Sequence, residues 1–196
     1  MSPSAINTVA SALTSSTTQA STAQTPALFS LAGKTVAITG AGRGLGITLA
    51  FAVVEAGGHA ACLDILPEPS NTEWQALTKL AKQLGTTATY RKCDVTSEAE
   101  VTQVLEEISC EGDERGAPLN GMVACAGIQQ RVPALDYEAS DFERMLRVNV
   151  VGAFISVKRA ARILKDKGTG GSIVLIASMS GQIANRVRTS TSTGHV

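Results

Sequence analysis

The chain has 196 residues with 17 basic and 17 acidic side chains, so its formal net charge is zero. This length suits one globular domain, and the neutral balance gives no electrostatic reason to expect nucleic acid or an anionic membrane as a partner. The uncharged apolar runs are as long as strands, well below the roughly 20 residues that a membrane-spanning helix requires.

The first 33 residues contain no Lys, Arg, Asp, Glu or His, and Ser, Thr and Ala dominate from Ser2 to Thr25. A mitochondrial presequence would carry arginines, and a secretory signal would have a basic start and a continuous apolar stretch. We therefore expect residues 1–31 to form a disordered tail. The four cysteines lack CxxC or Cys/His metal spacing, so we expect small core residues, no bound metal and a reducing, cytoplasmic location.

From Lys34 onward, apolar runs alternate with helical patterns, which is typical of βαβ units in a parallel sheet. We predict strands at 35–39, 59–64, 87–93, 119–124 and 171–178, and a first helix at 45–56. Three later helices end near Gly85, Cys110 and Gly168. Each begins with a capping box, at Ser70/Glu73, Ser97/Glu100 and Ser140/Glu143. The predicted fold class is α/β, a Rossmann-like doubly wound sheet that is truncated after its fifth strand.

The glycine-rich segment TGAGRGLG (39–46) joins the first strand to the first helix. Gly40 permits a tight turn, Gly44 lets the backbone approach a phosphate, and Gly46 lets the helix pack closely on the sheet. The helix N-terminus then presents free N–H groups to an anion, so we predict that Leu45 and the loop residues beside it contact a cofactor phosphate. The spacing is GxxxGxG and differs from GxGxxG, whose third glycine would fall on Leu45.

An acidic residue follows at the place where a nucleotide-binding fold needs one. Asp64 ends the second strand, 18 residues after Gly46. A carboxylate there holds the ribose 2′-hydroxyl and repels a 2′-phosphate, which favours NAD. Arg43 favours NADP as the alternative, because its side chain can reach a 2′-phosphate. The other interpretation of Asp64 is a solvated acid at a strand end.

The sequence resembles the classical type of the short-chain dehydrogenase/reductase family over about residues 32–187. Three of the matching motifs belong to the expected cofactor site. TGAGRGLG is similar to the family's TGxxxGxG loop. CDVT (93–96) resembles the segment after its third strand, which implies that Asp94 and Val95 lie beside the adenine. ACAG (124–127) is similar to its NNAG turn and matches at Ala126 and Gly127, with Cys125 in place of an asparagine.

Two further motifs resemble the family's catalytic segments. VNVVG (148–152) implies a catalytic Asn149, and IVLIASMSG (173–181) implies a catalytic Ser178. The resemblance implies strand order 3-2-1-4-5, usually a homo-oligomer, and an NAD(P)-dependent oxidoreductase that interconverts a secondary alcohol and a ketone. The overall sequence, notably the segment IASMSG, most resembles that of fungal members that act on polyols and ketoses.

The family's acid/base pair, a Tyr about a dozen residues after the Ser and a Lys four residues further on, has no counterpart. Tyr90 and Tyr137 both precede Ser178, and no Tyr-xxx-Lys occurs anywhere. Thr191 and His195 occupy the expected spacing, which we interpret as coincidence.

We therefore expect a C-terminally truncated, catalytically incomplete domain over 32–187. Residues 188–196 are then a low-complexity tail outside the family pattern. The alternative is a non-catalytic fragment that binds a dinucleotide or a protein partner. The apolar fifth strand would become an edge, and the predicted helix over 140–168 would have an open apolar face.

Overall fold

The structure is a computed structural model that describes residues 28–168 and 170–178. The chain divides after Ser30, and all elements described here lie in the unit Leu31–Val196. Thr191, His195 and the expected tail at 188–196 lie outside the described residues, as does the expected N-terminal tail up to residue 27.

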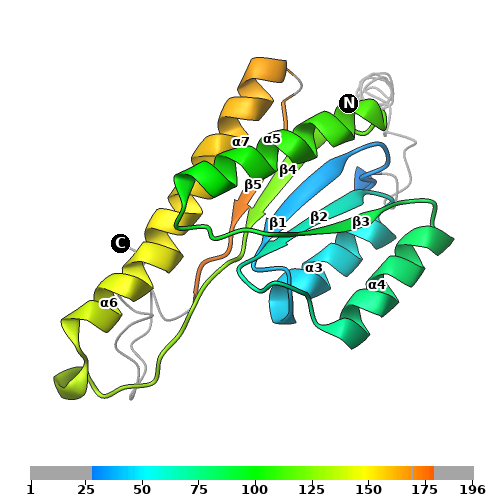
Figure 1. Ribbon diagram of the computed structural model, residues 1–196. Helices are drawn as coiled ribbons and strands as arrows, with labels where there is room; N and C mark the ends of the chain where they lie inside the picture. Colours follow the sequence, from blue (N-terminus) through cyan, green and yellow to red (C-terminus); the bar gives the residue numbers. More distant parts are fainter. Residues whose placement is uncertain (1–27, 169, 179–196) are drawn as a thin grey trace, which may run out of the picture. The chain divides into compact units, whose positions relative to one another are not determined.

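Five parallel strands form one sheet (Figure 1). They are β1 (Thr35–Thr39), β2 (His59–Asp64), β3 (Ala88–Lys92), β4 (Leu119–Ala124) and β5 (Ser172–Leu175). Their spatial order is β3-β2-β1-β4-β5, which confirms the expected order and fold class. At the end of β1, Thr39 is paired with Leu63 on one side and Ala124 on the other. The order of strands therefore reverses between β1 and β4, the position where such sheets bind ligands.

Helices cover both faces of the sheet (Figure 1). On one face, α3 (Gly44–Glu55) and α4 (Asn71–Gln83) pack together, and on the other α5 (Glu98–Glu114) packs against α7 (Ala153–Lys167). The neighbours Ala37 and Ile38 on β1 belong to separate core clusters. Such alternation is what a strand buried on both faces requires. Among the described helices, none has the length and apolar character needed to span a membrane.

The predicted helix over 140–168 differs from the structure in its interior. It begins as α6 (Ala139–Leu146), widens into a π-helical segment (Arg147–Gly152) and continues as α7. Gly168, with φ of 64°, ends it in the left-handed conformation. Single π-helical turns inside α-helices are rare, so apolar residues at helical spacing predict a continuous α-helix here.

Only one of the three predicted capping boxes holds its side-chain hydrogen bond. Ser97 accepts from the Glu100 N–H at 3.3 Å. Ser70 caps α4 without a side-chain bond. Ser140 lies inside α6, because the Glu138 carbonyl already accepts from two N–H groups of the first turn.

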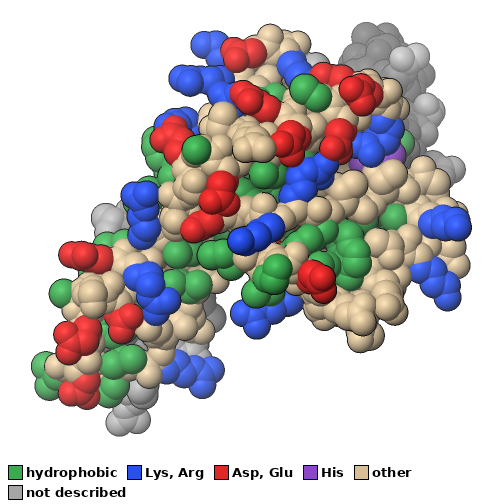
Figure 2. All heavy atoms as spheres, viewed as in Figure 1, with side chains coloured by type: hydrophobic (Ala, Val, Ile, Leu, Met, Phe, Trp, Pro, Cys, Tyr) green, Lys and Arg blue, Asp and Glu red, His purple; other side chains and the backbone are tan. Residues whose placement is uncertain are grey.

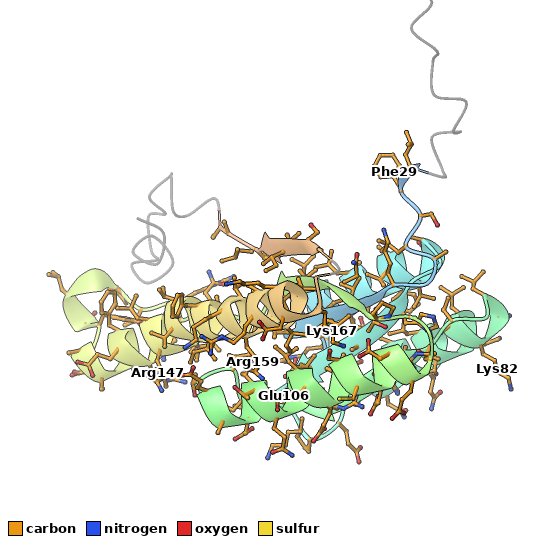
Figure 3. The ribbon with its side chains drawn as sticks, turned by 90° about the horizontal axis from the view of Figure 1, so that it is seen from above. Phe29, Lys82, Glu106, Arg147, Arg159 and Lys167 are labelled. Carbon is orange, nitrogen blue, oxygen red and sulfur yellow. The ribbon has the colours of Figure 1, made fainter. Side chains whose placement is uncertain are left out.

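Ion pairs join α5 to α7 along their outer surface. Arg159 pairs with Glu106, Lys167 with Asp113, and Lys158 with Glu98. Figure 3 shows Arg159 and Glu106 pointing toward each other from the two helices. Figure 2 shows acidic and basic side chains interspersed over this surface. Because the carboxylates are exposed, each pair contributes roughly 0–1 kcal/mol, and the apolar core beneath decides how these helices pack.

Candidate cofactor-binding site

A cavity of about 540 Å³ opens at the carboxyl ends of the strands, beside the reversal between β1 and β4. The segments that follow β1, β2, β3 and β4 all contribute to its lining. Every residue predicted to contact the cofactor is among them: Gly40, Arg43, Gly44, Leu45, Gly46, Asp64, Asp94, Val95, Ala126 and Gly127. The lining residues that the sequence analysis did not assign are Ile65, Leu66, Cys93, Cys125, Ile128 and Val148.

Each of the three glycines of the first loop has a different reason to lack a side chain. Gly40 has φ of 68°, and a Cβ there would lie 2.7 Å from the Ala126 Cα. A Cβ on Gly46 would lie 2.2 Å from the Gly40 carbonyl oxygen, so the close contact is with the loop itself. Gly44 has φ of 60° and open space where its Cβ would be. The loop is therefore compact beneath Gly46 and open to a ligand at Gly44.

The N-terminus of α3 borders the cavity without a capping side chain. Its N-cap residue, Arg43, makes no side-chain cap bond, and no acidic residue occupies the first turn. Arg43 is exposed. The first-turn N–H groups and the helix dipole are thus available to an anionic group.

The Asp64 carboxylate is held from two sides. Its Oδ2 accepts from the Gly42 N–H at 2.9 Å, and its Oδ1 accepts from the Leu66 N–H at 3.1 Å. A Cβ on Gly42 would lie 2.9 Å from the Asp64 Cγ, so a side chain at this position would displace the carboxylate. Sequence reasoning assigned no role to Gly42 or Leu66. The glycine at 42 was the available signal, although the partner that makes it necessary lies 22 residues away.

The segment after β3 places Asp94 and Val95 on the cavity wall. The Asp94 Oδ1 accepts from both the N–H and the hydroxyl of Thr96, each at 2.8 Å. Val95 is buried, and a Cβ on Gly152 would lie 2.7 Å from its Cγ2. Gly152 therefore lets the helix of the other layer approach this wall closely.

The turn after β4 is fixed by two side chains from other elements. The Thr39 hydroxyl oxygen lies 3.1 and 3.2 Å from the Cys125 and Ala126 N–H groups, from which it accepts hydrogen bonds. The Asn149 Oδ1 accepts from the Ile128 N–H at 2.8 Å, while its Nδ2 donates to the Ile128 carbonyl at 3.0 Å. Asn149 does not line the cavity itself, yet it holds the backbone of a residue that does.

Residues 34–193 match the family of sequences described as short chain dehydrogenase. The chain belongs to the short-chain dehydrogenase family. The match extends past Val187, where we expected the resemblance to end. The classical glycine loop, the parallel order and the helix-borne asparagine are all present in this family member.

Two solved structures and one curated relative illustrate the likeness. The short chain dehydrogenase/reductase notP' of Aspergillus versicolor is 36% identical over 159 residues, covering 81% of this chain and 53% of the relative. A short-chain dehydrogenase/reductase from Mycobacterium marinum superposes with a TM-score of 0.73 at 33% identity, covering 83% of this chain and 62% of that one. The structure of NAD⁺-bound xylitol dehydrogenase superposes with a TM-score of 0.72 at 28% identity, covering 84% of this chain and 60% of that one. The chain thus spans about half the length of the curated relative.

Ser178, the other predicted catalytic residue, is not brought to the cavity. It lies three residues beyond the end of β5, is half-buried, and is not a lining residue. In this short-chain dehydrogenase, the two predicted catalytic side chains therefore have different surroundings. Asn149 is integrated into the cavity wall through Ile128, and Ser178 follows β5, which is paired with β4 alone among the described residues.

The two thiols at the cavity are neutral. Burial raises the pKa of Cys93 to about 12, with added repulsion from Glu100 and Asp94. Burial also raises the pKa of Cys125. A neutral thiol is a poor nucleophile and a poor base. The chemical character of the lining is therefore set by the carboxylates of Asp64 and Asp94, the guanidinium of Arg43, open backbone N–H groups and apolar side chains, an arrangement suited to holding a nucleotide.

Proposed function

We propose that the cavity binds a nicotinamide dinucleotide, with NAD preferred over NADP. The observation that carries this proposal is the Asp64 carboxylate, held by the N–H groups of Gly42 and Leu66 beside an uncapped helix N-terminus. Each carboxylate oxygen has a further lone pair with which to accept from a ribose hydroxyl. A 2′-phosphate at the same place would bring a second negative charge against Asp64.

The residues present fit the parts of such a cofactor in chain order. The N–H groups from Gly44 to Gly46 would receive the pyrophosphate, since Gly44 is open where a side chain would stand. Asp94 and Val95 would flank the adenine, and Ala126 and Gly127 would lie along the cofactor's further course. The bound nicotinamide would supply hydride transfer. Arg43 remains the feature that favours NADP.

We further propose that the parent activity is the interconversion of a secondary alcohol and a ketone, with a polyol or ketose as the substrate class. The likeness to xylitol dehydrogenase supports this choice, since xylitol is a polyol. Asn149 and Ser178 are the proposed members of the catalytic set. Hydride transfer leaves an alkoxide that must gain a proton, and no Tyr-xxx-Lys pair occurs in these 196 residues. This chain is therefore proposed to bind dinucleotide with little or no turnover.

Two measurements on the purified chain test these proposals separately. NADH titration, followed by energy transfer from the single tryptophan, Trp74, should give saturable binding that is tighter than for NADPH. A turnover assay with NAD and a panel of polyols should give rates at least ~10²-fold below ordinary enzyme values, because the acid/base group is missing. Absence of NADH binding refutes the site. Turnover at ordinary enzyme rates refutes the proposed lack of activity and leaves the proposed binding site standing.

A further inference from the structure

The loop that follows β2, residues 65–70, is hydrogen-bonded to the Asp64 carboxylate and to the glycine loop. It leaves the sheet at Asp64 and enters α4 after Ser70. At its start, the Leu66 N–H donates to Asp64. At its end, the Ser70 N–H donates to the Gly42 carbonyl at 2.8 Å. Gly42 thus binds Asp64 through its N–H and the end of this loop through its carbonyl.

The Leu66 carbonyl receives its hydrogen bond from a different strand. The Tyr90 hydroxyl, on β3, donates to it at 2.8 Å. A β-turn would satisfy this carbonyl from the N–H of the residue three positions later, which is Pro69 and has none. The tyrosine hydroxyl therefore supplies a donor that the loop's own sequence lacks.

The Tyr90 ring is itself held in place. It packs edge-on against Trp74 of α4, with ring centroids 5.6 Å apart and an interplanar angle of 69°. Burial, with the nearby Asp64 and Cys62, raises the pKa of Tyr90 to about 12, so its hydroxyl stays protonated and able to donate. Leu66 is consequently held on both sides, by Asp64 at its N–H and by Tyr90 at its carbonyl.

We propose that Tyr90 is a positioning residue for cofactor selection, whose hydroxyl holds Leu66 so that Asp64 faces the 2′ position of the adenosine ribose. This inference rests on the proposed NAD site and goes beyond it, because Tyr90 does not line the cavity. Without the hydroxyl, the loop and the carboxylate gain freedom. A mobile carboxylate loses part of its bond to a 2′-hydroxyl and part of its repulsion of a 2′-phosphate.

The test compares dissociation constants for NADH and NADPH on the same sample of the full chain. Their ratio does not depend on the fraction of folded protein. Tyr90→Phe keeps the ring and removes the hydroxyl, and should lower the NADH preference by about three- to tenfold, the range expected from one hydrogen bond. Asp64→Asn should lower it by about tenfold or more, because the charge itself is removed.

Tyr137→Phe is the matched control. Its hydroxyl also donates a hydrogen bond, to the Gln130 Oε1 at 2.9 Å, and its ring packs edge-on against Phe142. The ratio of the two dissociation constants should stay within about twofold of that of the unaltered chain, since Tyr137, Gln130 and Phe142 do not line the cavity.

The outcomes separate the two proposals. If Asp64→Asn changes the ratio and Tyr90→Phe weakens both cofactors equally or leaves the ratio unchanged, Tyr90 is only structural and this inference is wrong. If Asp64→Asn leaves the ratio unchanged, the proposed NAD preference is wrong. If the unaltered chain binds neither dinucleotide, both proposals are overturned.

Discussion

The strands β1 and β5 have similar sequences, TVAIT and SIVL, and opposite surroundings. All five residues of β1 are buried. In β5, Val174 is 45% exposed and Leu175 57% exposed. Strand β1 has a strand on each side and helices on both faces, whereas β5 is paired within the described residues with β4 alone. An apolar, β-branched sequence therefore predicts a strand, but the neighbours decide how much of it is buried.

The same contrast occurs between consecutive residues of the long helix. Ile155 is 5% exposed and belongs to the core, whereas the adjacent Phe154 is 61% exposed. Val150, one turn earlier, is also exposed. Within the described residues, the predicted open apolar face of this helix is confirmed. The cavity is lined by the segments that follow β1, β2, β3 and β4 and by Val148 of the π-helical segment, and no residue of β5 lines it.

The largest expected effect tests the difference between these two regions directly. Met122→Ala, at a buried site on β4, should lower the free energy of unfolding by about 2–5 kcal/mol, because it creates a cavity in the core. Val174→Ala on the adjacent β5 should cost only about 0.5 kcal/mol, because Val174 is 45% exposed and the smaller side chain leaves no enclosed cavity. Urea denaturation of both variants measures the difference. Equal costs would contradict the exposure of β5.

A second substitution tests the packing of the glycine loop. Gly46→Ala should destabilise the fold by about 3 kcal/mol and weaken NADH binding, because its Cβ would lie 2.2 Å from the Gly40 carbonyl oxygen and the loop backbone would have to shift. Gly85→Ala is the control, since Gly85 has φ of 70° and open space around it. It should cost about 1 kcal/mol from backbone strain alone and leave binding unchanged. Thermal unfolding and NADH titration distinguish these results.

A third variant tests the bond between β1 and the turn after β4. Thr39→Val should cost about 1–2 kcal/mol, because the N–H groups of Cys125 and Ala126 lose their acceptor. Thr78→Val removes a hydroxyl whose acceptors, the Trp74 and Gln75 carbonyls, both lie within α4, and should change stability by less than about 0.5 kcal/mol. Equal effects in chemical denaturation would argue that the turn is held by other contacts.

The smallest expected effect is a pH dependence at the opposite end of the sheet. Burial and the positive charge of Arg115 lower the pKa of His59 from 6.5. His59 then binds a proton more readily in the unfolded chain than in the folded one. Its contribution to the free energy of unfolding should be fully present above pH 6.5 and should decline as the pH falls from there toward the folded-state pKa. His59→Gln should flatten this part of the stability profile. A profile with the same slope in both proteins would assign the decline to other groups.

Much of the architecture was predictable because its signals are local. The strand at 119–124 agrees with β4 residue for residue, and Gly168 ends α7 as expected. The π-helical segment around Asn149 was not predicted, since such segments are rare and helical spacing by itself indicates a continuous α-helix. The capping box expected at Ser140 was also wrong, because the helix has its N-cap at Glu138, two residues earlier than the motif suggests.

The sequence by itself determined the alternation of strands and helices, the glycine loop and the acid at the end of β2, since periodicity and turn chemistry depend on near neighbours. The tertiary structure decided which partners those residues have. Gly42 reaches Asp64, Tyr90 reaches Leu66, and Asn149 reaches Ile128 because parallel pairing and helix packing bring together residues about 20 positions apart. The tertiary structure also decided which residues are buried, as the buried β1 and the partly exposed β5 show. Hydrogen-bond partners and solvent exposure depend on what lies alongside in space, and no local pattern contains that information.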